Sequence, residues 1–170
     1  MLNYDKQQYA IQQVCENGHK ITGCYKVDKL ADMLNINEKP KEFCQDCGAA
    51  TIIDCPSCGN EIQGDKLKVN YGTSDVVKSS IVPSYCVKCG KPYPWTEKMI
   101  IAAIQVFAEL GVQESTIDED MHNIAKDIPQ ATPSAIRIER ICKKLGPLAY
   151  NVVMEFATKT TTEILKGNMP

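Results

Sequence analysis

The sequence predicts a small β region that binds metal, followed by an all-α helical bundle. Three observations support this fold class. Cysteines occur in short pairs between residues 15 and 89, and these pairs stop before Trp95. After Trp95 the apolar residues recur at the three- and four-residue spacing of helices. A chain of 170 residues that is 44% hydrophobic can form one ordinary domain or two small ones.

Four short segments in the first part each carry two side chains that suit a zinc ion. Zinc prefers four sulfur or nitrogen ligands in a tetrahedron, and a Cys-x-x-Cys turn presents two sulfurs to one ion. A glycine follows three of these segments and lies within the fourth, where it permits the positive φ that closes the turn. The chain therefore offers eight ligands, enough for two Zn2+ ions. The pairs are Cys15 with His19, Cys44 with Cys47, Cys55 with Cys58, and Cys86 with Cys89.

Three combinations of these pairs are conceivable, and their spacing favours the sequential one. It joins the first pair to the second across 24 residues and the third to the fourth across 27, and either insert can hold a hairpin. Pairing the middle two would leave only residues 48–54 to cross between them. We therefore predict a tandem double zinc ribbon over residues 13–95, with the first ribbon at 14–53 and the second at 54–95.

Other interpretations of the cysteines are open. Iron is an alternative metal at the second site, because CPSCG is also similar to a rubredoxin knuckle and this site has four cysteines. The cysteines could also be core residues without a ligand, although seven of the nine lie in the short pairs, which favours metal over disulfides in a reducing compartment. Cys24 and Cys142 remain outside the pairs, and we expect them to be a free thiol and a core residue.

Four helices are expected after Trp95, forming a bundle over residues 96–168. The residues that mark the starts and ends of the first three are Thr96 and Gly111, Thr116 and Pro129, and Thr132 and Gly146. The fourth covers residues 148–166 and carries an apolar stripe. Because this stripe exceeds what one small bundle needs, we expect a homo-oligomer formed through the C-terminal helices.

The charge of the chain does not favour nucleic acid as a partner. The formal net charge is −2, and neither side of Trp95 has an excess of basic residues. Two bound zinc ions with seven thiolates would bring the net charge to about −5. Tight binding to a phosphate backbone usually needs a concentrated basic surface. Lys66, Lys68 and Lys78 lie close together in the sequence, so nucleic-acid binding in a regulatory or defence complex stays the alternative hypothesis.

The sequence indicates a cytoplasmic protein without a membrane segment. Its first residues lack the basic start and apolar core of a secretory signal. No apolar run approaches the roughly 20 residues that span a bilayer.

No catalytic motif is visible. His122 stands alone among acidic residues, which is typical of a solvated surface histidine. Zinc sites filled by four protein ligands leave no open position for a reacting water, so both predicted sites are expected to be structural. The sequence therefore predicts that the protein is not an enzyme.

The motif string of the first part resembles a bacterial family of uncharacterised double zinc-ribbon proteins. The motifs are CENGH, FCQDCG, CPSCG, EIQGD and VPSYCVKCGKPYPWTE, which together cover about residues 13–98. The resemblance implies two zinc sites built from the same eight residues, and it implies no activity. The chain departs from this pattern in a segment between Gly64 and Pro83 that is richer in lysine and serine.

These observations lead to one functional hypothesis. We expect a non-enzymatic interaction or scaffold protein in which two zinc-braced ribbons present a recognition surface and the helical part docks a protein partner or dimerises. Contacts are expected in residues 64–83 and along the ribbon edges, because loops on a rigid frame commonly carry binding.

Overall fold

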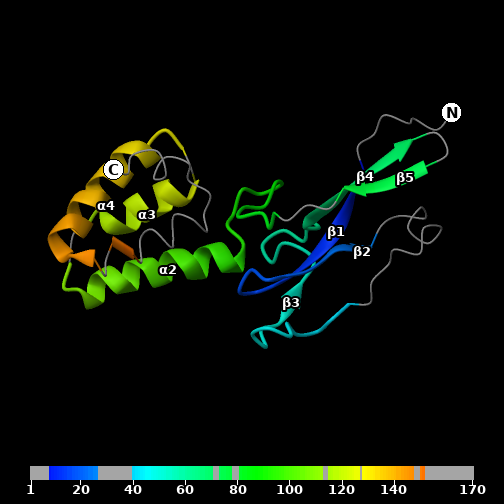
Figure 1. Cartoon of the computed structure of the whole chain (residues 1–170), viewed down its shortest axis with the longest axis horizontal. Coiled ribbons are helices and arrows are strands. Elements are labelled where there is room, and N and C mark those ends of the chain that lie inside the picture. Colours follow the sequence, from blue (N-terminus) through cyan, green and yellow to red (C-terminus); the bar gives the residue numbers. More distant parts are fainter. Residues whose placement is uncertain are drawn as a thin grey trace. The chain divides into compact units, whose positions relative to one another are not determined.

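The chain folds into a small antiparallel sheet followed by helices (Figure 1). The computed structural model describes residues 8–26, 40–70, 73–77, 81–112, 115–126, 128–147 and 150–151. The contacts between residues divide the chain into two compact units, residues 1–95 and 96–170.

Strand β1 (Gln8–Cys15) is the centre of the sheet in the first unit. Strand β2 (Lys20–Lys26) pairs with one edge of β1. The other edge is shared by β4 (Gln63–Asn70) and the two-residue strand β3 (Thr51–Ile52), which pair with opposite ends of β1. Strand β5 (Thr73–Val77) pairs with β4. All these pairings are antiparallel, so the sheet has the order β2-β1-β4-β5 with β3 beside it.

Strands β2 and β4 meet at two glycines. A Cβ atom on Gly64 would lie 2.3 Å from the carbonyl oxygen of Gly23, and one on Gly23 would lie 2.2 Å from a carboxylate oxygen of Asp65. Next to this crossing, Lys20 Nζ lies 2.8 Å from Asp65 Oδ1. A side chain on Gly64 would therefore overlap neighbouring backbone, whereas one on Gly23 would displace the Asp65 carboxylate.

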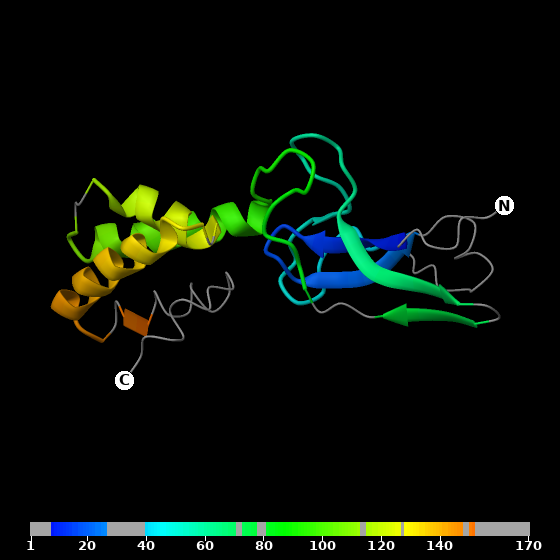
Figure 2. The same cartoon turned by 90° about the horizontal axis from the view of Figure 1, so that it is seen from above.

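Residues 64–83, expected as a long loop, mainly form a hairpin. Strands β4 and β5 run side by side there (Figure 2). Lys66 lies in β4 and is half-buried, the side chain of Lys68 is outside the described part, and so is Lys78. The sheet also joins residues ahead of the predicted first ribbon to the second ribbon, since Gln8, Tyr9 and Ile11 of β1 pair with β4. This pairing joins residues more than fifty positions apart. The spacing of the cysteines carries no information about such a pairing.

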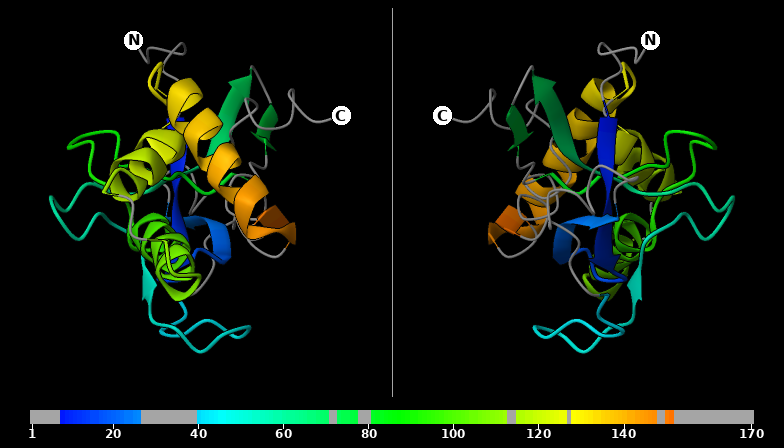
Figure 3. Two further views of the ribbon diagram at one scale, coloured as in Figure 1. Left: turned by 90° about the vertical axis from the view of Figure 1, so that its left-hand side faces the viewer. Right: turned by 90° about the vertical axis from the view of Figure 1, so that its right-hand side faces the viewer.

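Three helices are described in the second part of the chain, α2 (Pro94–Glu109), α3 (Ile117–Lys126) and α4 (Ala131–Leu145) (Figure 3). Their apolar faces enclose one core. Its largest fully buried side chains are Phe107, Ile100, Met121, Ile124 and Ile138. The fourth helix expected at 148–166 lies outside the described residues, apart from Tyr150 and Asn151.

The helix ends follow local chemistry. After α2, the Val112 N–H donates to the Phe107 carbonyl and the Gly111 N–H to that of Ala108, with Gly111 at φ 77°. These two bonds form a Schellman motif. At its start α2 begins with Pro94, ahead of the expected cap Thr96, because proline suits the first turn of a helix. Among the helices described, none is sufficiently long and apolar to cross a membrane.

Candidate metal centres

The three Cys-x-x-Cys turns share one backbone geometry. In each, the residue before the first cysteine forms a bridge with the residue seven positions later: Phe43 with Ala50, Asp54 with Glu61, and Tyr85 with Pro92. In each, the N–H of the glycine after the second cysteine donates to the carbonyl of the first, at 2.8–2.9 Å. These glycines have φ between 66° and 70°, which is favourable for glycine alone. Short-range hydrogen bonds therefore fix how each turn presents its two sulfurs.

The fourth turn connects β1 to β2 and carries Cys15 and His19. The Cys15 N–H donates to the His19 carbonyl at 3.0 Å, and the Gly18 N–H donates to the Cys15 carbonyl at 2.8 Å. The His19 N–H also points at the Cys15 sulfur, 3.3 Å away. The turn thus places a sulfur and an imidazole on one side of the strand connection.

The structure brings the eight residues into two sets of four. Within each set the ligand atoms all lie within 4.8 Å of one another. These are the sets of the sequential pairing, with the turn of residues 15–19 facing the turn of 44–47, and the turn of 55–58 facing that of 86–89. The sets are Cys15, His19, Cys44 and Cys47, and Cys55, Cys58, Cys86 and Cys89.

The distances between the ligand atoms match the edges of a tetrahedron around a small ion. Bonds of about 2.3 Å to sulfur and about 2.0–2.1 Å to nitrogen require edges of about 3.8 Å between sulfurs and about 3.6 Å between sulfur and nitrogen. In the first set, the sulfurs of Cys15 and Cys47 are 3.8 Å apart, and Cys44 Sγ lies 3.6 Å from His19 Nδ1. In the second set, the two closest facing sulfur pairs are 3.8 and 3.7 Å apart. A disulfide would need about 2.05 Å, so both sets can each hold a metal ion.

Hydrogen bonds prepare some of these thiols to bind a cation. The Ala49 N–H lowers the pKa of Cys47 to about 6, and the Cys89 N–H lowers the pKa of Cys86 to about 6. Burial, in contrast, raises the pKa of Cys15. A bound cation would favour the thiolate at every position, because it offsets the repulsion between crowded sulfurs.

An apolar cluster supports the second set. Tyr93 stacks on Trp95 with ring centroids 4.7 Å apart, and Trp95 Nε1 donates to the Pro83 carbonyl at 2.9 Å. Tyr93 is 1% exposed, and its pKa is raised by burial, by nearby thiolates and by a hydrogen bond to Cys86. A hydrogen bond from a phenol to a ligand sulfur is the kind of outer contact that steadies a metal site.

Most of the chain matches a known protein family. A model of the family described as "Uncharacterized protein conserved in bacteria (DUF2321)" matches residues 8–169. The chain belongs to the DUF2321 family. No curated protein and no solved structure matches it. In this DUF2321 protein, both candidate metal centres lie inside the matched region.

Three other residues singled out from the sequence, Cys24, Cys142 and His122, belong to neither ligand set of the DUF2321 protein. Cys24 is buried in β2 and belongs to neither set. Cys142 is buried in α4, where burial raises its pKa to about 11. His122 lies on α3, with its Nδ1 2.8 Å from the Asp118 carbonyl oxygen. Tyr93 was not singled out, although its place in the unusual string KPYPWT was a signal that could have found it.

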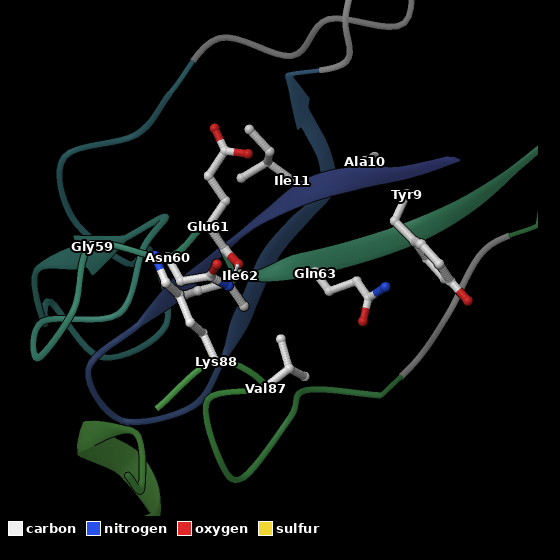
Figure 4. A pocket seen from close by; sticks show the side chains of 10 residues that line it. All are labelled: Tyr9, Ala10, Ile11, Gly59, Asn60, Glu61, Ile62, Gln63, Val87 and Lys88. Carbon is white, nitrogen blue, oxygen red and sulfur yellow. Dashed lines mark hydrogen bonds between the residues drawn. The ribbon is translucent and has the colours of Figure 1, made fainter. Parts of the chain in front are cut away.

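An open cavity of about 480 Å³ lies beside the second centre of the DUF2321 protein (Figure 4). Tyr9 and Gln63 line it from the sheet, and Val87 and Lys88 line it from the turn between Cys86 and Cys89. Val87 is 74% exposed although it is apolar. The metal-binding turn therefore forms one wall of a surface hollow with mixed apolar and polar character.

Proposed function

We propose that this chain is a non-enzymatic interaction protein whose first unit is braced by two zinc ions. The observation that carries the proposal is the pair of four-ligand sets at tetrahedral spacing. The apolar cluster beside the second set has six buried residues, two of which are the ligand cysteines Cys55 and Cys86, so bound metal would add stability that this small core lacks.

Zinc is the metal that these donors favour. The first set includes a histidine nitrogen beside three sulfurs, a combination typical of structural zinc. The second set of four sulfurs also suits iron, so the metal there has to be measured.

Both sets would be filled by protein atoms. A catalytic zinc usually has three protein ligands and an open position for water or substrate, whereas a structural one has four. Four ligands in each set therefore support a structural role and a function carried by surface contacts.

Native mass spectrometry on untagged full-length protein, purified without chelators, tests the metal part of this proposal. We expect two zinc ions per chain and a colourless sample. Iron at either site, or a single ion per chain, would contradict it.

The partner surface is expected on the metal-bound turns. Phe43 and Val87 are apolar yet 62% and 74% exposed, and each lies in a turn that holds ligands. Exposed apolar side chains on a rigid frame are common at protein contacts.

A photo-crosslinking residue at position 87 tests this placement. It should capture one defined partner protein in cells and lose it when Cys89→Ser disables the adjacent site. The same residue at position 126, exposed on α3, is the control. Capture that is equal at both positions, or that survives Cys89→Ser, would contradict the placement.

A further inference from the structure

We infer that the two metal centres are coupled, so that an ion bound at one raises the affinity of the other. This inference rests on the proposed metal binding. Three separate connections carry it, and each links the first centre to the second.

The first contact is the end of strand β1. Cys15 supplies a ligand to the first centre. Its neighbour Val14 is fully buried and packs in the apolar cluster that contains Cys55 and Cys86 of the second centre. Because consecutive residues in a strand point to opposite faces, β1 presents one residue to each centre. A shift of β1 at one centre therefore moves the other.

The second contact is the segment of residues 48–54 between the two centres. This segment runs directly from the turn of Cys44 and Cys47 to the turn of Cys55 and Cys58. The Glu16 N–H donates to the Ala50 carbonyl at 2.9 Å, and the Ile62 N–H donates to the Ile53 carbonyl at 2.8 Å. Between these bonds, Thr51 and Ile52 pair with the end of β1. Fixing the turn at either end of this segment therefore orders the segment for both.

The third contact joins Gly18 to Trp95. Gly18 lies within the turn of the first centre, and Trp95 belongs to the apolar cluster of the second. A Cβ atom on Gly18 would lie 3.0 Å from Trp95 Cβ and 3.2 Å from its Cγ. The first turn thus packs directly against the indole of the second core.

These contacts predict positive cooperativity. The first ion orders the end of β1, the linking segment and the Gly18 turn at the cost of chain entropy. The second ion then binds to parts that are already ordered, so it binds more tightly. Coupling of this kind typically changes affinity 5–150-fold and must be equal in both directions.

Titration of metal-free full-length protein with zinc(II), followed by native mass spectrometry, gives the first test. At one ion per chain, independent sites of equal affinity would leave about half of the chains with a single ion, whereas 100-fold coupling would leave about one-tenth. We expect mainly metal-free and two-zinc chains. A single-ion species at half or more of the population would overturn the inference if the variants described next show equal intrinsic affinities for the two centres.

Two ligand variants give the second test and separate coupling from a difference in intrinsic affinity. Cys89→Ser and Cys47→Ser each disable one centre at an exposed ligand, so the buried core is untouched. Zinc(II) dissociation constants are measured by competition with a chromophoric chelator. If the centres are coupled, the intact centre of each variant binds zinc at least about fivefold more weakly than the same centre of the wild-type protein does when its other centre is filled. If the two variant constants instead reproduce the two stepwise constants of the wild type, the centres are independent and the inference fails.

Val14→Ala should reduce the coupling, because it removes the side chain through which β1 reaches the second core. Val106→Ala makes the same change in α2 and should leave the coupling unchanged. A wild-type protein that binds no zinc would refute the proposed function itself. Two ions bound independently would refute the coupling alone.

Discussion

Tyr93 lies against the second metal centre without being one of its ligands. Burial and the neighbouring Cys86 thiol raise the pKa of its phenol, and its ring stacks on Trp95. Outer contacts of this kind hold a ligand in position and tune its basicity. A single buried phenol therefore links the apolar core to a ligand sulfur.

Tyr93→Phe should weaken metal binding at the second centre about tenfold, because outer contacts to metal ligands are typically worth 10- to 100-fold in affinity. The stacking on Trp95 should remain, so the fold should persist. Competition with a chromophoric chelator measures the affinity. Tyr9→Phe, on the partly exposed tyrosine of β1, is the control and should have no such effect. Equal affinities for Tyr93→Phe and wild type would show that the hydroxyl is not needed.

At the scale of elements, the sheet depends on the crossing of β2 and β4. Gly64 has backbone atoms of Gly23 and Gln12 at 2.3 and 2.8 Å from the position of a Cβ atom. Backbone cannot move away as a flexible side chain can, so the crossing tolerates no side chain at this position.

Gly64→Ala should destabilise the first unit by about 3 kcal/mol through this overlap. Gly48→Ala is the matched control, since its Cβ would meet nothing within 4 Å and its φ of 69° alone should cost about 1–2 kcal/mol. Urea unfolding followed by the fluorescence of Trp95, the single tryptophan of the chain, reports the difference. A smaller loss for Gly64→Ala than for Gly48→Ala would contradict the role of the crossing.

Helices α3 and α4 are joined by a buried ion pair. Asp120 on α3 is fully buried and accepts hydrogen bonds from Arg137 Nε at 3.1 and 3.0 Å, while Arg137 Nη2 also contacts Ser134 Oγ at 3.1 Å. Burial opposes ionisation of Asp120, but hydrogen bonds from Arg137 and Ser134 and the Arg137 charge outweigh it and lower its pKa. The pair therefore stabilises the helical unit in its ionised form.

Arg137→Leu should destabilise the helical unit by about 1–2 kcal/mol at pH 7, because it leaves a buried carboxylate without its main donors. The loss stays modest because the arginine side chain is 45% exposed and its charge is screened by water. Since the folded pKa of Asp120 is lowered, the stability it contributes is present above the unfolded pKa of about 3.9 and is lost as the pH falls below it. Thermal unfolding followed by far-UV circular dichroism should show the difference between the two proteins narrowing as the pH falls below about 3.9 and through the folded pKa of Asp120.

The control for this change is Arg140→Leu, on an exposed arginine of the same helix. It should alter stability by less than about 0.5 kcal/mol. Equal losses for the two variants at pH 7 would mean that the Asp120 pair adds nothing beyond surface charge.

At the scale of the whole molecule, the two units differ in what can stabilise them. The first unit contains both candidate centres, whereas the helical unit has an apolar core of its own and contains no ligand set among its described residues. The two units should therefore respond differently to loss of metal.

Treatment with EDTA should unfold the first unit and leave the helical signal largely intact. The emission of Trp95 should shift to longer wavelength as its apolar cluster opens, while the circular dichroism at 222 nm should change little. Adding zinc(II) back should reverse the shift. Loss of both signals together would show that the helical unit depends on the metal.

The sequence by itself determined the parts that local chemistry controls. A Cys-x-x-Cys-Gly turn is closed by hydrogen bonds within eight residues, so its ligands can be recognised from spacing alone. The same spacing selected the pairs that the structure brings together. Helices α2, α3 and α4 were likewise visible from their apolar period and end signals, with errors of a few residues at their starts.

Contacts between distant segments could be known only from the folded chain. The pairing of β1 with β4, the close approach at Gly23 and Gly64, and the pair Asp120–Arg137 join residues that no local pattern relates. Such contacts depend on which surfaces meet when the whole chain packs, and many sequences with the same local pattern would pack differently. The coupling inferred between the two centres arises at this level, because Val14, Gly18 and residues 48–54 acquire their roles only when both centres share one sheet.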